Sequence, residues 1–240
     1  MRSSFAGLPL LISRVLNSIY PADCPVCSNR SDSYVYAPVC SSCWSQIERY
    51  DGPSCCICGL PFVSEHARIC GDCLKTKPVF SQVIAYGLYE GILKEAISQF
   101  KFHGLRRLSQ PLGSLLSGLE IPKADAIVPV PLTARGLRQR GFNQSLLVAS
   151  ALSKKTGVPL YLDALFKIKE TPPQVGLSAA ERRSNLTGAF TAKGDLKNIR
   201  ILLIDDVVTT GATAAACSKA LLKAGALEVI VLAIARAGML

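Results

Sequence analysis

The chain has 240 residues, of which 49% are hydrophobic and only 18% are charged. This composition supports a sizeable core and argues against long disordered segments. The formal net charge of +10 predicts a basic surface, which suits pyrophosphate or nucleic acid as a partner without selecting between them.

Residues 1–20 are predicted to form a short amphipathic helix. The apolar stretch from Phe5 to Ile19 is interrupted by Pro9 and Arg14, and no small-residue cleavage site precedes Tyr20. This pattern disfavours a secretory signal peptide. No later apolar run reaches the length of a membrane span. We therefore expect a cytoplasmic protein with no membrane span.

Cysteine is concentrated in residues 21–77, which we expect to form a double zinc ribbon. Eight of the ten cysteines occur as four C-x-x-C pairs, and two such pairs can hold one cation in a tetrahedral tetrathiolate site. Disulfides are disfavoured because the cytosol is reducing, and iron is the main alternative to zinc. Two zinc sites carrying −2 each would lower the net charge to about +6. The expected ligands are Cys24, Cys27, Cys40, Cys43, Cys55, Cys58, Cys70 and Cys73.

The pairing of these cysteines stays open in the sequence. Similar linker lengths favour two consecutive ribbons, 24–43 and 55–73, but a cross-braced arrangement is also compatible with the spacing. So small a module would depend on metal to fold, and we expect it to serve structure or recognition. Contacts with nucleic acid or protein are expected from Trp44, Arg49, Tyr50 and residues 75–77, unless these are ordinary surface residues.

Residues 78–240 have the alternating pattern of an α/β domain. Strands are expected at 83–88, 126–130, 199–204 and 228–235, and helices at 92–100, 105–119, 146–156 and 214–224. A strand-like stretch is expected at 161–168, and residues 189–191 are expected to return to the sheet. Cys217 lies alone on the last helix and is expected to be buried.

Two segments of this domain are predicted to bind anions. Residues 133–143 form a glycine-punctuated loop in which Arg135, Arg138 and Arg140 are expected to grip a polyanion. Residues 170–188 are too long for a routine connection and are interpreted as a lid with Gln174, Arg182 and Arg183 as its contacts. The alternatives are a solvated basic loop for the first segment and a disordered surface loop for the second.

The stretch from 201 to 213 carries the clearest functional signal. A buried strand at 201–204 is followed by Asp205 and Asp206, at the strand end where α/β sheets bind their ligands. A small hydroxylated loop then runs directly into a helix, whose free N–H groups suit a phosphate. Paired acids accept hydrogen bonds from a diol, so acid pair and loop together suit ribose 5-phosphate. The loop residues are Thr209, Thr210, Gly211, Ala212 and Thr213.

Three other interpretations of this stretch are weaker. Asp206 could cap the following helix, or the acid pair could be the magnesium site of a receiver domain. A receiver needs further strands after its acid pair, and too little chain remains here. The loop has no lysine of the Walker type, so it is not an ordinary P-loop.

The stretch resembles the phosphoribosyl pyrophosphate (PRPP) motif of phosphoribosyltransferases, and the whole chain resembles the ComF family. That resemblance implies a type I-like phosphoribosyltransferase fold, an α/β parallel sheet flanked by helices, behind an N-terminal double zinc ribbon. Further matching elements are Lys101-Phe-His-Gly104, Val128-Pro-Val-Pro131, Arg140-Gly-Phe-Asn-Gln144, Pro173-Gln174, and Arg182 with Asn185.

By resemblance, Asp205 and Asp206 hold the ribose of PRPP, residues 209–213 hold its 5-phosphate, and Mg²⁺ accompanies the ligand. The basic loop at 133–143 is implied to hold the pyrophosphate. The family is linked to natural transformation, with incoming single-stranded DNA, a helicase-like protein and recombination proteins as implied partners.

Two functions follow from the resemblance. The first is a DNA-processing factor that binds PRPP, and the second is an enzyme that transfers phosphoribose to a nucleobase or small molecule and releases pyrophosphate. Thr209 stands where purine-salvage enzymes have an acidic base, which weighs against the second. The acceptor, the turnover of PRPP and the oligomeric state are left open by the sequence.

Overall fold

The computed structural model describes residues 22–64, 66–170 and 185–238. The predicted helix at 1–20 and the lid residues Gln174, Arg182 and Arg183 lie outside these residues. No helix among the described residues is long and apolar enough to cross a membrane. The predicted domain boundaries at residues 20 and 77 stay predictions.

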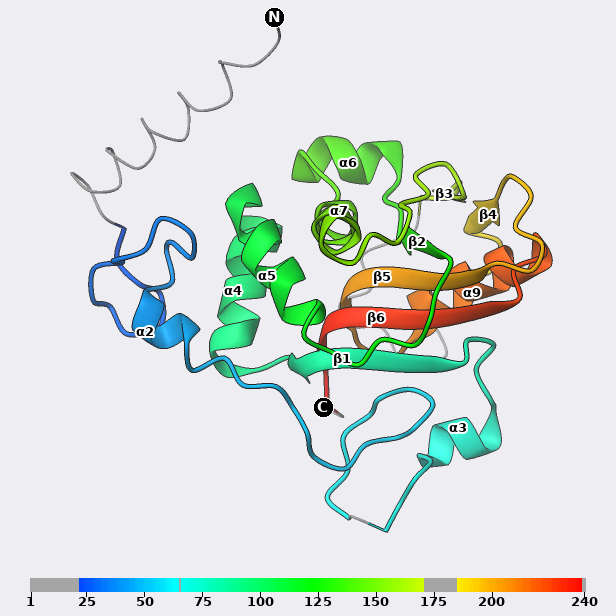
Figure 1. Ribbon diagram of the computed structural model, residues 1–240, viewed down its shortest axis with the longest axis horizontal. Coiled ribbons are helices and arrows are strands. Elements are labelled where there is room, and N and C mark those ends of the chain that lie inside the picture. Colours follow the sequence, from blue (N-terminus) through cyan, green and yellow to red (C-terminus); the bar gives the residue numbers. More distant parts are fainter. Residues whose placement is uncertain (1–21, 65, 171–184, 239–240) are drawn as a thin grey trace, which may run out of the picture.

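A four-stranded parallel sheet forms the centre of the fold, in the order β1-β6-β5-β2 (Figure 1). All its neighbouring strands pair in parallel, which confirms the predicted class of an α/β parallel sheet flanked by helices. The strands are β1 (Gln82–Leu88), β2 (Ala126–Pro129), β5 (Arg200–Val208) and β6 (Glu228–Arg236).

Both faces of this sheet are buried, because alternate residues of its strands enter two separate cores. In β5, Ile201 and Leu203 belong to one core, and Leu202 and Ile204 belong to the other. Continuous apolar runs of this kind are what a doubly covered parallel sheet requires. The core that contains Ile201 includes α9 (Ala212–Lys223), and the core that contains Leu202 includes α4 (Gly91–Phe102), α5 (Ser109–Leu116) and α7 (Gln144–Thr156).

Several predicted elements differ from the structure. The stretch predicted as one helix at 105–119 is a 3₁₀ turn, Arg106–Leu108, followed by α5. Residues 189–191 do not return to the main sheet, since β4 (Phe190–Ala192) pairs antiparallel with β3 (Leu165–Lys167) in a separate two-stranded sheet. The strand predicted to end at residue 204 continues to Val208, so the acid pair lies within β5.

The loop predicted at 133–143 is mostly a helix, α6 (Ala134–Arg140). Thr133 caps it, with its Oγ1 accepting from the backbone N–H of Gly136 at 3.0 Å. Gly141 ends it in the left-handed conformation, with φ 73°. Threonine before a helix and glycine after it are ordinary boundary signals, and the interpretation as a loop overlooked both.

The two cysteine modules pack on opposite faces of the sheet. The first cysteine module, residues 22–47, shares a core with α4, and its Cys24 and Trp44 are buried there. The second cysteine module, residues 54–75, shares the other core with α9. Trp44 is only 8% exposed and stacks on Tyr36. The expectation that Trp44 contacts a partner is therefore wrong.

The second module and the chain leading out of the first also cover the outer edge of β1. The backbone N–H of Val83 donates to the carbonyl of Ile57, and that of Tyr50 donates to the carbonyl of Tyr86. An exposed strand edge offers unpaired donors and acceptors to other chains. Here the second module and the chain that leads out of the first module form hydrogen bonds with that edge.

Candidate functional site

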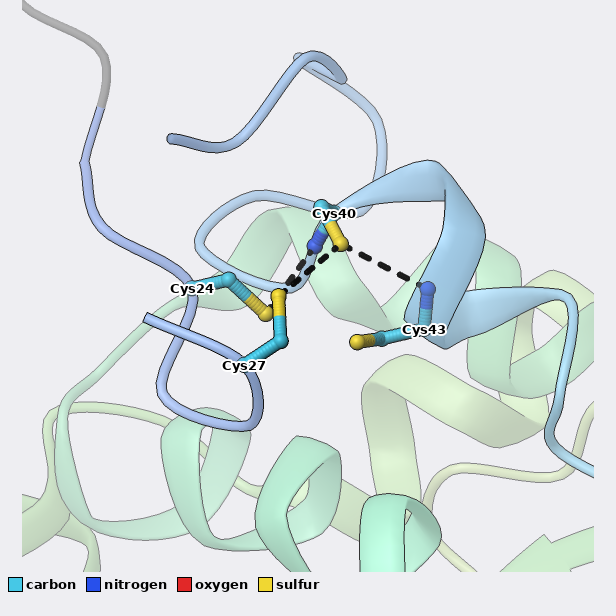
Figure 2. Close-up of side chains that lie close together, drawn as sticks. All are labelled: Cys24, Cys27, Cys40 and Cys43. Carbon is cyan, nitrogen blue, oxygen red and sulfur yellow. Dashed lines mark hydrogen bonds between the residues drawn. The ribbon is translucent and has the colours of Figure 1, made fainter. Parts of the chain in front are cut away.

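Each cysteine module brings four sulfurs together. In the first module the sulfurs of Cys24, Cys27, Cys40 and Cys43 lie within 4.8 Å of one another, and Figure 2 shows them pointing into one space. In the second module the sulfurs of Cys55, Cys58, Cys70 and Cys73 do the same. The pairing is thus sequential, which removes the cross-braced alternative.

The sulfur geometry fits zinc. A tetrahedral site with Zn–S bonds of about 2.3 Å has sulfur–sulfur edges of about 3.8 Å. The Sγ atoms of Cys27 and Cys40 are 3.7 Å apart, and those of Cys58 and Cys70 are 3.6 Å apart. Both separations are far longer than the S–S bond of a disulfide.

In each module, backbone N–H groups stabilise the thiolate form of one cysteine, which is the form that binds a cation. Burial favours the neutral thiol of Cys24, but N–H groups of Cys40, Cys27 and Val26 outweigh burial and lower its pKa to about 6. Burial acts in the same direction on Cys55, and backbone donors led by Cys58 and Cys70 lower its pKa to about 7. Each cluster therefore has one thiol that ionises near neutrality, as a metal ligand must.

The acid pair forms the centre of the second candidate site. Asp206 is 6% exposed and makes an ion pair with Lys101 of α4, whose Nζ lies 2.9 Å from its Oδ2. The Oδ1 of Asp205 accepts from the hydroxyl of Ser145 on α7 at 3.3 Å and from the backbone N–H of Asp206 at 2.9 Å. Three elements thus converge on the two carboxylates.

The pKa of Asp205 is raised to about 7, mainly by burial and then by the charge of Asp206, while Lys101 opposes the rise. Two close acids cannot both be charged at low cost without nearby cations. Lys101 supplies one positive charge to this pair. The site would gain from a further cation or from hydroxyl donors, and the diol of a ribose with its Mg²⁺ offers both.

The predicted phosphate loop follows directly. Gly211 is the N-cap of α9 with φ 76°, a conformation that strongly favours glycine. The first N–H of this helix to find an intrahelical acceptor is that of Ala215, which donates to Gly211, so earlier N–H groups point to the loop. Asp205 and residues 207–214 line a small hollow of about 20 Å³. Because Gly211 caps α9, Asp206 does not, which removes the capping alternative.

The arginines of α6 follow β2 at the same edge of the sheet. The backbone N–H of Val130 donates to Ile204, next to the acid pair. Arg140 reaches Gln144 at 3.5 Å, and Gln144 donates to the carbonyl of Lys101 at 3.4 Å. Arg135 and Arg138 are exposed. Pyrophosphate binding by these three arginines stays a prediction.

Three residues near the predicted sites were not identified in the sequence. Lys101 and Ser145 contact the acid pair, and Arg236 lies beneath the loop, donating to the carbonyls of Val208 and Thr209. Lys101 lies in the last turn of an amphipathic helix and in a motif noted for the family, so that motif was a usable signal. For Arg236 the signal was a charged residue that ends the apolar strand β6.

A larger cavity of about 270 Å³ lies away from the acids, between the second cysteine module and β1. Its lining includes Arg49, Tyr50, Cys56 and Gln82. Neither acid of the pair reaches it.

The cysteine-rich part of the chain matches a known family model. Residues 15–74 match the family model described as "Double zinc ribbon domain". Among solved structures, a glutamine PRPP amidotransferase from Bacillus subtilis overlaps 52% of this chain at 25% identity. The overlap spans 25% of that enzyme, and its TM-score of 0.37 is too low to bear on function.

Curated relatives match over most of the chain. "Competence protein F" of Haemophilus influenzae is 36% identical over 214 residues, which cover 83% of this chain and 90% of the relative. "DNA utilization protein YhgH" of Escherichia coli is 35% identical over 208 residues, covering 82% and 90%. With its two four-cysteine clusters and its parallel α/β sheet, the chain therefore belongs to the competence protein F (ComF) family.

Proposed function

We propose that this chain binds PRPP together with Mg²⁺ and acts in the cytoplasm on incoming single-stranded DNA during natural transformation. The observation that carries the ligand is the acid pair within β5, held by Lys101 and Ser145 and followed, after residues 207–210, by the N-terminus of α9. Carboxylates suit the ribose hydroxyls, and backbone N–H groups suit the 5-phosphate.

Charge supports a polyanionic ligand at this edge of the sheet. Lys101 lies at the acid pair, and α6 carries Arg135, Arg138 and Arg140 from the end of the neighbouring strand. Guanidinium groups bind phosphate oxygens in a fork. These arginines would hold the pyrophosphate of PRPP, and the acid pair would hold Mg²⁺, which would neutralise part of the phosphate charge. Arg182 and Arg183, outside the described residues, stay candidates for further contacts with the pyrophosphate.

The relatives' names support the biological role. One relative is named for competence and the other for DNA utilization, and both names suit a role in handling DNA. The net charge of +10 suits a partner with a phosphate backbone. We further propose a helicase-like or recombination protein as a partner, as the resemblance to the family implies.

Calorimetry with PRPP and Mg²⁺ tests the ligand. Asp205→Asn combined with Asp206→Asn keeps the side-chain shapes but removes both charges, and we expect affinity to fall about hundredfold or more. The control is Asp163→Asn, because Asp163 is exposed and outside the site. Equal affinities for the wild type and the double variant would refute the PRPP site.

Transfer of phosphoribose to a nucleobase or another small acceptor is the second candidate. The arrangement of acid pair, loop and basic helix suits displacement of pyrophosphate, because it places charge at both ends of the ligand. Pyrophosphate release is measured with candidate bases and with single-stranded DNA. Release that depends on one acceptor supports the enzyme, whereas DNA binding without release supports the DNA-handling factor.

A further inference from the structure

Arg236, the last residue of β6, joins the second cysteine module to the start of the phosphate loop. It is 4% exposed, and its Nε donates to the carbonyl of Cys58 at 2.8 Å. Its Nη1 donates to the carbonyls of Val208 at 3.2 Å, Ala237 at 2.7 Å, and Thr209. Its Nη2 lies 4.0 Å from the sulfur of Cys58.

In the part of the chain that the structure describes, the guanidinium of Arg236 has no carboxylate partner. Within residues 22–64, 66–170 and 185–238, no acidic side chain lies within ion-pair distance of its guanidinium. A buried charge is costly unless an opposite charge compensates it. A zinc ion with four thiolates carries −2, and Cys58 belongs to the second cluster. The zinc–tetrathiolate centre of that cluster, with its net charge of −2, would compensate the charge of Arg236.

The Nη1 of Arg236 holds the backbone at the start of the phosphate loop. Val208 is the last residue of β5, and Thr209 is the first residue of the loop. Their carbonyls accept from the same nitrogen of Arg236. The ring of Phe80 also lies close to the loop, since a Cβ built on Gly211 would lie 3.7 Å from it. Phe80 belongs to the same core as the second module.

We propose that Arg236 is a positioning residue that couples zinc in the second cysteine cluster to the placement of the phosphate loop. The effect on PRPP affinity rests on the proposed function, whereas the link between zinc and loop rests on the contacts of Arg236 alone. Binding at two coupled sites is reciprocal. PRPP therefore strengthens the binding of zinc to the second cluster, and loss of that zinc weakens PRPP binding.

The test compares Arg236→Lys with Arg107→Lys in the full chain loaded with zinc. Lysine keeps the charge, but its single ammonium group cannot replace a fork that reaches several acceptors at once. Arg107 is the matched control, because its Nε donates to the carbonyl of Ala37 in the first module at 2.9 Å, on the other face of the sheet. Hydrogen exchange of residues 205–216 and zinc release to a chromogenic chelator are measured without PRPP.

In Arg236→Lys we expect loop exchange and the release of one of the two zinc ions to become about tenfold faster. In Arg107→Lys loop exchange stays as in the wild type. Loop exchange in Arg236→Lys equal to the wild type overturns the proposal, as does an equal acceleration in Arg107→Lys. If Arg236→Lys yields no folded protein, the same exchange measured on Cys73→Ser and Cys43→Ser decides, with acceleration expected only in Cys73→Ser.

Titration with PRPP and Mg²⁺ separates the two proposals. A wild type that does not bind PRPP refutes the proposed function, yet the exchange and zinc measurements still decide the role of Arg236. If the wild type binds PRPP, we expect Arg236→Lys to bind about tenfold more weakly and Arg107→Lys to bind equally well. Equal affinity in Arg236→Lys rules out the coupling to PRPP.

Discussion

The two cysteine modules have the same local plan but different connections to the rest of the molecule. In each, a short helix begins directly after the third cysteine, which caps it through its own sulfur: Cys40 caps α2 (Ser41–Trp44) and Cys70 caps α3 (Gly71–Lys75). The first module lies on the face of the sheet that carries α4, and the second lies on the face that carries α9.

Each module is therefore linked to a different half of the proposed site: the first to the acid pair and the second to the phosphate loop. The first packs against α4, which presents Lys101 to Asp206. The second reaches the phosphate loop directly, through the hydrogen bonds of Arg236. The first module supports the acid pair only through packing, so changes in the second should reach the ligand more strongly.

Removing one sulfur from each module gives the largest expected effect. Cys43 and Cys73 hold equivalent positions, in α2 and α3 respectively. Cys43→Ser and Cys73→Ser should each lose one of two zinc ions, because three thiolates complete a tetrahedral site poorly. We expect each to lower the Tm by about 10 °C, which corresponds to a few kcal/mol for a chain of this size.

PRPP affinity then distinguishes the modules. Calorimetry should find binding weakened about tenfold more by Cys73→Ser than by Cys43→Ser, since a charged hydrogen bond contributes about 1.5–3 kcal/mol. Zinc content measured on the same samples shows whether one ion was lost in both. Equal weakening in two variants that each retain one zinc would contradict the proposed asymmetry.

Lys101→Met removes the ion pair between Asp206 and α4, the helix against which the first module packs. It leaves the buried carboxylate of Asp206 without its ion-pair partner, and breaking such a pair costs about 3–5 kcal/mol. It also removes the charge that lowers the pKa of Asp205, so that pKa should rise further. We expect a lower free energy of unfolding at pH 8 by chemical denaturation, and weaker PRPP binding.

Lys94→Met is the control for this change. Lys94 is exposed on the same helix, with its Nζ over the ring of Tyr89, and among the described residues it makes no ion pair with either acid. Its loss should change stability by less than about 1 kcal/mol. Equal losses in both variants would show that α4 tolerates either change and that the ion pair contributes little.

The sequence predicts those parts of the molecule whose geometry is local. A C-x-x-C pair, or an acid pair followed by a loop and a helix, lies within a few residues, so its spacing determines its shape. The pairing of the cysteine pairs depends on the path of the chain between them, and the sequence left it open. In the structure the four sulfurs of each module lie together, which shows sequential pairing, and each module lies on its own face of the sheet.

Residues that join distant segments were missed for the same reason. The bond from Lys101 to Asp206 spans 105 positions, and the bond from Arg236 to Cys58 spans 178. No period or motif connects residues at such separations. The error at α6 has a different origin, since the capping signals of Thr133 and Gly141 were present but arginine and glycine content was given more weight.

The smallest expected effect concerns the pH dependence of stability at the acid pair, the half of the site that the first module supports. The native carboxyl of Asp205 has a pKa of about 7, against an ordinary value of 3.8. Its contribution to stability is therefore complete below pH 3.8 and is lost as the pH rises through 7. Above pH 7 the wild type holds a buried charge next to Asp206, which Asp205→Asn removes.

Asp205→Asn should therefore unfold at a higher temperature than the wild type at pH 8, by about 2–4 °C, and the difference should shrink at pH 5. The exposed control Asp163→Asn should show no such trend.

Calorimetric scans of Arg236→Lys over the same pH range test whether the second module affects the acid pair. Because Arg236 contacts the loop and not the carboxylates, this variant should keep the wild-type pH dependence at a lower Tm. A pH dependence altered as in Asp205→Asn would mean that the second module also acts on the acid pair.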